Sequence, residues 1–163
     1  VVSLNEEDEI RSANTAVELD VDYLMGGTWV NIVSEIIKST KIKYLPFPGK
    51  VVGHPSVLEG TIDEITKSAI DLSSNNYVYG LDLLSYRFKG NVEKVIKSVE
   101  NKTKAPIVSA GSIDSCKINK IVSNLGVLAF TVGSAAFEKK IANGSSSIVD
   151  QLEDIFKLSN KYR

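Results

Sequence analysis

The sequence predicts a parallel α/β fold from three observations. Short apolar runs without charged residues, such as Pro106–Ala110 and Leu128–Val132, are typical of parallel strands that are covered on both faces. Between these two runs, four apolar residues recur at the i, i+3, i+4 and i+7 spacing of one helix face, namely Ile118, Ile121, Val122 and Leu125. Strand and helix patterns of this kind alternate along the chain without a break in composition.

The expected elements follow one another through a single domain that covers residues 1–163. Asn5 is an N-cap residue before acidic residues, and Thr61 with Glu64 has the spacing of a capping box, so helices are expected to begin at both places. The apolar stripes of the expected helices cover residues 10–17, 30–37, 62–72, 92–99, 118–125 and 148–156. The expected strands are Val1–Leu4, Tyr23–Met25, Lys43–Pro46, Tyr77–Leu84, Pro106–Ala110 and Leu128–Val132. Val51–Gly60 carries Gly and Pro and is expected to be an irregular loop.

Two arrangements of parallel strands fit this alternation, an open doubly wound sheet and a (β/α)₈ barrel. The barrel is favoured because the sequence opens in mid-strand, because turns with polar or glycine residues follow every strand, and because Gly-Ser follows each of the last two strands. A complete barrel usually has more than about 200 residues. The expected fold is therefore an α/β (β/α)₈ TIM barrel truncated to about the last six βα units, with the missing strands before Val1. Such a fragment exposes two strand edges, which predicts a homo-oligomer.

The two Gly-Ser turns are the first candidate ligand site. Gly111-Ser112 follows one expected strand and Gly133-Ser134 follows the next. Glycine lets the backbone approach a ligand closely, and a helix that begins directly afterwards directs free N–H groups and partial positive charge at it. The pair of turns therefore predicts a phosphate-binding site, with ordinary turn geometry as the alternative reading.

Composition excludes several classes of function. The net charge is −1 and the Lys and Arg residues are scattered, so a nucleic-acid partner is not expected. No apolar run is long enough to span a bilayer, so a membrane partner is not expected either. The single Cys116 cannot form an internal disulfide, which fits a cytoplasmic location. No His, Cys or carboxylate residues have the spacing of metal ligands, and neither a metal nor a cofactor is expected.

The motifs carry a resemblance to known proteins. The turns AGSIDS at Ala110–Ser115 and FTVGSAAF at Phe130–Phe137 resemble those of the phosphate-binding (β/α)₈ barrels, which include the phosphoribosyl isomerases and the indole-forming enzymes of histidine and tryptophan biosynthesis. The chain is also similar to bacterial barrel proteins that share PFPG, VGHPSVLEG and GLDLLxYR, here at Pro46–Gly49, Val52–Gly60 and Gly80–Arg87. The resemblance implies a full barrel with two further strands in front and a phosphate held after the last two strands.

Three other residues are candidates for catalysis. Asp82 is a carboxylate in an otherwise apolar strand, so it is expected to be either a general base with a raised pKa or one half of a buried ion pair. Arg87 directly follows the same strand and is expected to hold an anionic group, with a solvated loop charge as the alternative. His54 precedes Pro55 in the irregular segment and is either an acid or base over the site or a residue that stabilises its own loop.

Together these residues predict a lyase or isomerase, aldolase-like in type, that acts on a small phosphorylated metabolite. The two Gly-Ser turns would hold the phosphate, Asp82 would move protons, and Arg87 and His54 would orient the rest of the substrate. A second hypothesis is a non-catalytic barrel that senses a phosphorylated ligand, similar to the antiterminators that respond to glycerol phosphate. A third is that the truncated form is inactive.

Overall fold

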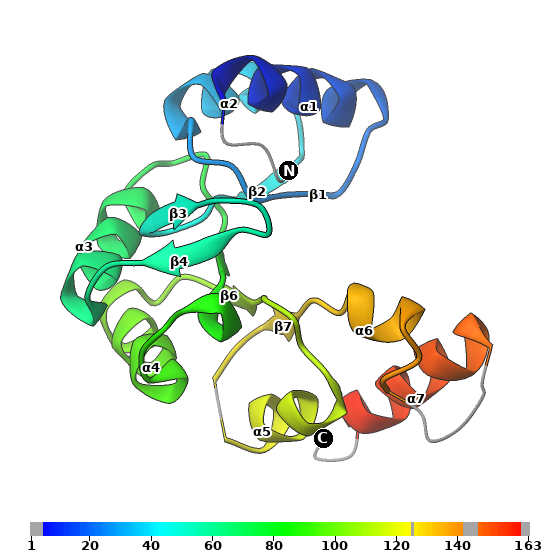
Figure 1. Ribbon diagram of the computed structural model, residues 1–163. Helices are drawn as coiled ribbons and strands as arrows, with labels where there is room; N and C mark the ends of the chain where they lie inside the picture. The colour runs from blue at the N-terminus through cyan, green and yellow to red at the C-terminus, as the bar shows by residue number, and fades with distance from the viewer. Residues whose placement is uncertain (1–4, 125, 142–146, 161–163) are drawn as a thin grey trace.

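The computed structural model describes residues 5–124, 126–141 and 147–160, in which helices and short strands alternate (Figure 1). The helices are α1 (Glu6–Glu18), α2 (Val30–Ile37), α3 (Ile62–Ser73), α4 (Val92–Thr103), α5 (Ser115–Asn124), α6 (Ser134–Phe137) and α7 (Ile148–Asn160), with a 3-10 turn η1 at Ser85–Arg87. The strands are β1 (Tyr23–Met25), β2 (Lys43–Leu45), β3 (Lys50–Val52), β4 (Val57–Glu59), β5 (Leu81–Leu83), β6 (Ile107–Ser109) and β7 (Ala129–Phe130). The alternation of helices and strands agrees with the prediction, but the strands are not all parallel as expected, because β3 and β4 pair antiparallel.

The predicted truncated barrel is wrong. The described residues form a parallel pair β1–β2, an antiparallel pair β3–β4 and a parallel three-stranded sheet β5–β6–β7, and these sheets do not close into a barrel. A (β/α)₈ barrel is one continuous parallel sheet, whereas these strands pair in separate sheets of two or three strands, one of them antiparallel. Outside the named strands, backbone hydrogen bonds and an isolated bridge join the β2 segment to the residues around β5, for example from the Tyr79 N–H to the Tyr44 carbonyl at 2.9 Å and from the Asp82 N–H to the Pro46 carbonyl at 3.0 Å. The expected first strand lies outside the described residues.

The segment Val51–Gly60 is not the irregular loop that its Gly and Pro content predicts. Lys50–Val52 pairs antiparallel with Val57–Glu59, and Lys50 forms an ion pair with Glu59 across the two strands at 3.2 Å. Leu58 also makes an isolated parallel bridge with Phe88, just after η1. This β3–β4 hairpin therefore joins the end of β2 to the residues that follow β5.

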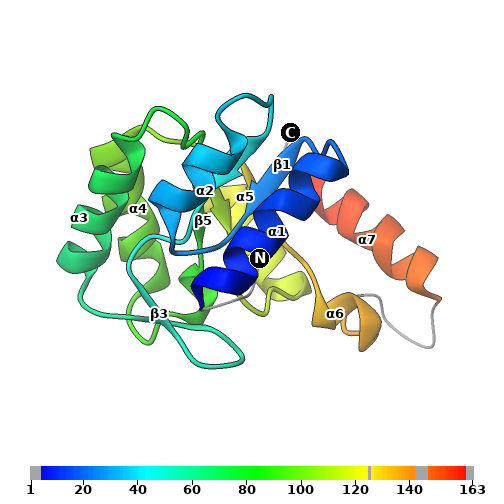
Figure 2. The ribbon, with the colours of Figure 1, turned by 90° about the horizontal axis from the view of Figure 1, so that it is seen from above.

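Three separate hydrophobic clusters stabilise the fold. One lies between α3, α4 and the strands β5 and β6, a second joins α1 and α2 to β1 and β2, and a third holds α5, α6 and part of α7. Figure 2 shows α3 and α4 side by side at one end of the molecule and α7 at the other. The predicted caps at Asn5 and at Thr61 with Glu64 are confirmed.

The last helix differs from its expected apolar stripe. Ile155 packs into the third cluster, but Ile148, Leu152 and Phe156 are exposed, Phe156 at 71% of its surface.

Within the described residues, no helix combines the length and apolar content needed to cross a bilayer.

Candidate functional site

The β6 and β7 strands bring the two Gly-Ser turns together. They are parallel neighbours, with Val108 opposite Ala129 and Ser109 opposite Phe130. Because parallel strands end at the same edge of a sheet, the residues after β6 and after β7 lie on the same side. The expected adjacency of these two turns is thus observed.

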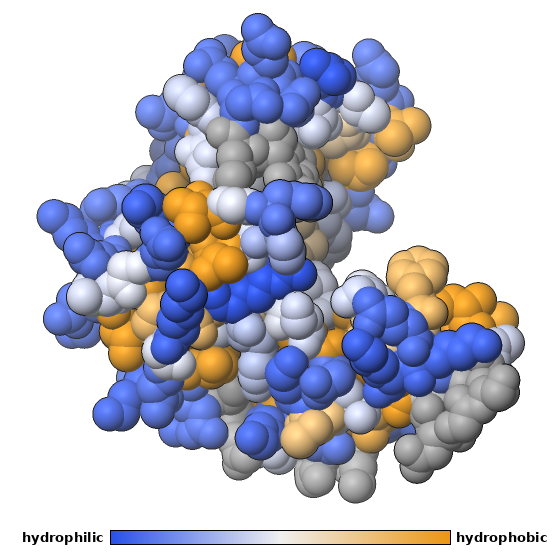
Figure 3. All heavy atoms as spheres, in the orientation of Figure 1, coloured by the Kyte–Doolittle hydropathy of each residue, from blue (hydrophilic) through white to orange (hydrophobic). Residues whose placement is uncertain are grey.

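Both turns line one cavity of about 290 Å³. Its lining residues are Met25, Phe47, Ser56, Asp82, Leu84, Arg87, Ala110, Gly111, Ser112, Thr131, Gly133 and Ser134. Small-molecule sites usually have volumes of roughly 300–1,000 Å³, so this cavity is sized for a small metabolite. The molecule is notched between the α1–α2 end and the α6–α7 end (Figure 3), and β1 and α6, on the two sides of this notch, both contribute lining residues.

The cavity has an exposed rim and a buried floor. Ser112, Gly133 and Ser134 are exposed, whereas Ser56, Asp82 and Leu84 are buried. Groups at the rim remain in contact with water, while a group at the floor lies in a low-dielectric environment, where charge is costly and unpaired hydrogen-bonding groups are rare. The two ends of the cavity therefore favour different parts of a ligand.

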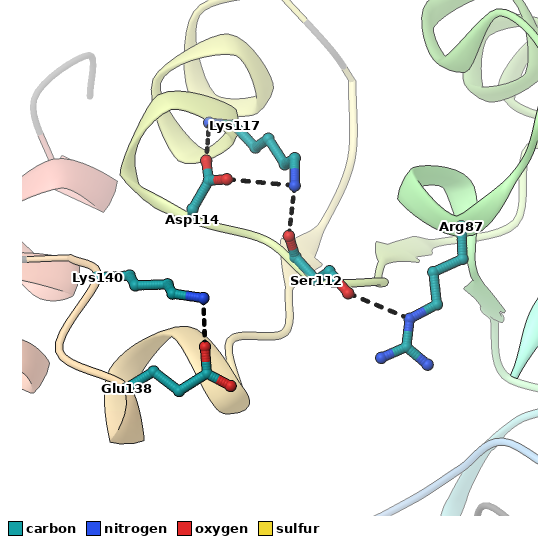
Figure 4. Close-up of polar contacts among 6 residues, drawn as sticks. All are labelled: Arg87, Ser112, Asp114, Lys117, Glu138 and Lys140. Atoms are coloured by element: carbon teal, nitrogen blue, oxygen red, sulfur yellow. Dashed lines mark hydrogen bonds and ion pairs between the residues drawn. The ribbon is translucent and has the colours of Figure 1, made fainter. Parts of the chain in front are cut away.

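Arg87 supplies the positive charge among the lining residues that the structure describes. Its Nε donates to Ser112 Oγ at 3.3 Å (Figure 4). Its Nη1 donates to the Ser56 carbonyl at 3.2 Å. Both acceptors are neutral, and no carboxylate forms an ion pair with Arg87 in the described part of the chain. The cavity therefore presents an uncompensated cation, which favours an anionic ligand.

The neighbouring lysines are already paired. Lys117 Nζ donates to the Ser112 carbonyl at 2.5 Å and lies 3.2 Å from the Asp114 carboxylate, and Lys140 pairs with Glu138 (Figure 4). Their charge is largely satisfied within the protein. Arg87 is consequently the cation that a bound anion would meet.

Helix N-termini contribute less to this site than the Gly-Ser turns predict. The α5 helix begins three residues after Ser112, and the Asp114 carboxylate already accepts the Lys117 N–H in its first turn at 3.0 Å. The α6 helix begins directly at Ser134 but is only four residues long. Anion recognition here would rest on Arg87 and the serine hydroxyls.

Asp82 faces the cavity from the middle of β5. Leu81 and Leu83 are fully buried in the cluster with α3 and α4, so the alternation of a strand directs Asp82 to the opposite face. Its side chain is buried, and its Oδ1 has no hydrogen-bond partner within the described residues. Burial raises the pKa of this carboxyl from 3.8 to about 7. No Lys or Arg forms an ion pair with Asp82 among the described residues, and the charge of the chain's N-terminus lowers the pKa of Asp82 by less than burial raises it.

His54 does not reach the cavity. It lies in the exposed turn of the β3–β4 hairpin and is absent from the lining residues. Ser56, two residues further on, is buried and does line the cavity. The segment that carries His54 therefore reaches the cavity through Ser56, and the expected role of His54 gains no support from the lining residues.

Other lining residues were not predicted from the sequence. Phe47 lies in PFPG and Thr131 in FTVGSAAF, two motifs that carry the resemblance, but neither residue was expected to line a site. A polar residue just before a Gly-Ser turn, as at Thr131, is a signal that sequence reasoning could have used.

The turn after β1 is occupied by the protein's own carboxylate. Glu9 of α1 is buried and accepts hydrogen bonds from the Thr28 N–H at 2.7 Å and the Trp29 N–H at 2.8 Å. Gly27 has φ +91°, which favours glycine, and a Cβ there would lie 2.7 Å from Glu9 Oε2 and displace it. The Gly26–Thr28 turn therefore binds an internal anion, not a ligand.

The described residues contain no group of three His, Cys, Asp or Glu side chains able to hold a metal ion. No model of a known protein family matches the sequence, and no curated protein matches it significantly. The geometry of the cavity is therefore what bears on function.

Gly111→Ala tests the packing that positions Arg87. Gly111 has φ +109°, and a Cβ there would lie 2.9 Å from both Arg87 Cγ and the Arg87 backbone N. We expect the substitution to destabilise the protein by about 1–3 kcal/mol in urea unfolding, because backbone strain and overpacking add. Gly53→Ala is the matched control, since Gly53 also has a positive φ (+73°) but a Cβ there would meet only the Pro55 carbonyl, at 3.8 Å. Equal stability of the two variants would contradict the packing.

Asp82 predicts a specific pH dependence of stability. Its pKa is raised on folding from 3.8 to about 7, so the native state binds more protons than the unfolded state between these values, and stability is lost as pH rises through this window. Asp82→Asn removes this effect. The difference in the free energy of unfolding, variant minus original protein, should therefore rise by on the order of 2 kcal/mol when the pH is raised from about 5 to about 8. Urea unfolding at both pH values measures it, and a pH-independent difference would show that the carboxyl is not buried as described.

Proposed function

We propose that this chain binds a small phosphorylated metabolite in the cavity and acts on it as a lyase or isomerase. The observation that carries the proposal is that two groups line one small cavity: Arg87, a cation without a carboxylate partner among the described residues, and Asp82, a buried carboxyl whose Oδ1 has no hydrogen-bond partner there. The phosphate would lie at the rim, against Arg87, Ser112 and the Gly133-Ser134 turn. The carbon skeleton would extend toward the floor.

Asp82 would act as the proton-transfer group. A general acid or base is most effective when its pKa lies near the working pH, and the pKa of Asp82, raised to about 7 by burial, meets this condition. Near neutral pH the carboxyl would accept a proton from one carbon or oxygen of the substrate and return it to another. This is the chemistry that an isomerase or a lyase requires.

The phosphate would contribute by positioning. Binding energy from a group that does not react can hold the reacting carbon beside the carboxyl, which converts a collision into an intramolecular step. Arg87 would be a positioning residue, since it is fixed by Ser112 and Ser56 and touches the anionic end of the ligand. His54 has no part in this scheme because it does not line the cavity.

The expected self-association stays a prediction. The outer edges of β1 and β7 have no strand partner in the described residues, and α7 exposes apolar side chains, both of which favour contacts between copies.

The phosphate site is tested with Arg87→Gln. We expect the Kd for inorganic phosphate to rise at least about tenfold, because a charge-assisted contact is lost. Lys89→Gln is the matched control: it removes the same charge two residues away, where the side chain is exposed and does not line the cavity, and the Kd should stay within about twofold. Isothermal titration calorimetry at fixed ionic strength measures both. Equal weakening by the two variants would mean that phosphate responds only to net charge.

Turnover distinguishes the enzyme from a ligand sensor. A thermal-shift screen of sugar phosphates identifies the compounds that bind, and each is then assayed for conversion. We expect Asp82→Asn to retain binding and to lose at least about a hundredfold in rate, as removal of a general acid or base does. Binding without turnover by the unsubstituted protein would contradict the enzyme and favour a sensor.

A further inference from the structure

Ser56 provides a second unpartnered polar group in the cavity. Its side chain is 2% exposed, and its Oγ has no hydrogen-bond partner within the described residues. Asp82 Oδ1 is in the same state, and both residues line the same cavity. Buried hydroxyl and carboxyl oxygens are paired in the great majority of cases. Two such groups facing one cavity indicate partners that come from a ligand.

The position of Ser56 is fixed by the site itself. Its carbonyl accepts a hydrogen bond from Arg87 Nη1 at 3.2 Å, and the bridge between Leu58 and Phe88 anchors the following strand beside η1. The hydroxyl is therefore held in place before any ligand arrives. A preorganised group of this kind contributes to selectivity more than a mobile one, since binding does not have to order it.

The cavity thus has two chemically different ends. Arg87, Ser112 and Ser134 offer hydrogen-bond donors toward an anion near the rim. Ser56 and Asp82 offer a buried hydroxyl and carboxyl at the floor, among Phe47 and Leu84. An alkyl chain at the floor would leave both polar groups unpaired, whereas a hydroxyl or carbonyl group would satisfy them.

We propose that Ser56 is a specificity-determining residue that, together with Asp82, binds a hydroxyl or carbonyl oxygen of the ligand. The ligand would then be a hydroxylated or oxo-substituted alkyl phosphate, and a simple alkyl phosphate would be rejected. This inference rests on the proposed phosphate site and deepens it. A site built to hydrogen-bond a substrate hydroxyl discriminates strongly against the analogue that lacks it.

Isothermal titration calorimetry with three probes tests the inference. Inorganic phosphate has the anionic group alone, n-propyl phosphate adds an alkyl chain, and glycerol 3-phosphate adds hydroxyl groups to that chain. For the unsubstituted protein we expect glycerol 3-phosphate to bind at least about tenfold more tightly than n-propyl phosphate. Ser56→Ala should reduce this ratio to below about threefold and leave the affinity for inorganic phosphate within about twofold. Ser74→Ala, at an exposed helix C-cap, should change neither value.

The outcomes separate this inference from the proposed function. Equal binding of n-propyl phosphate and glycerol 3-phosphate by the unsubstituted protein would overturn the role of Ser56 while leaving the phosphate site intact, and it needs no variant to fold. Equal weakening of all three probes in Ser56→Ala would also overturn it, because the serine would then act only by holding the hairpin. Failure of inorganic phosphate to bind at all would overturn the proposed function, and this inference with it.

Discussion

The contacts of Arg87 are the constraint on which the cavity depends. Its guanidinium joins the loop after β6, through Ser112, to the β3–β4 hairpin, through the Ser56 carbonyl. These segments are far apart in the sequence, and η1 brings Arg87 between them. The approach is possible because Gly111 has no side chain where a Cβ would meet Arg87 at 2.9 Å. One side chain thereby fixes one wall of the cavity and leaves its own charge without a carboxylate partner in the described residues.

Asp82 and Ser56 depend on the same arrangement. The β5 strand must be buried on one face to pack against α3 and α4, so its single polar residue is directed to the other face, toward the cavity. The hairpin covers that side and buries Ser56. Both groups lose water without gaining a protein partner in the described residues, which costs stability. Such costs are common where a protein keeps groups ready for a ligand.

The sequence predicted local elements better than their assembly. Apolar periodicity and capping residues located most helices, and the spacing of the last two strands correctly predicted that the Gly-Ser turns are neighbours. Barrel closure depends on hydrogen bonds between distant strands, which no local pattern encodes, and the truncated barrel was therefore wrong. The hairpin was missed because Gly53 and Pro55 read as loop residues. Ser56 was missed as a lining residue of the cavity, and Glu9 was missed as the residue that binds the turn after β1. Both roles depend on burial of the side chain, which the identity of one polar residue in the sequence does not reveal.

The division of the cavity into rim and floor follows from electrostatics. In the proposed site, a phosphate at the exposed rim would keep part of its hydration and would contact Arg87 without the full cost of desolvation. The reacting group of the ligand, by contrast, would lie at the buried floor. There the electrostatic effect of gaining or losing a proton at Asp82 is not screened by water, so it would act strongly on that group. If the two positions were exchanged, the phosphate would carry its charge into the apolar floor beside the carboxyl, and the carboxyl would lose the burial that raises its pKa. In the proposed site, Arg87 lies four residues beyond the buried β5 strand and Ser112 lies at the exposed rim, so the anion and the transferred proton would be held at different ends of the cavity.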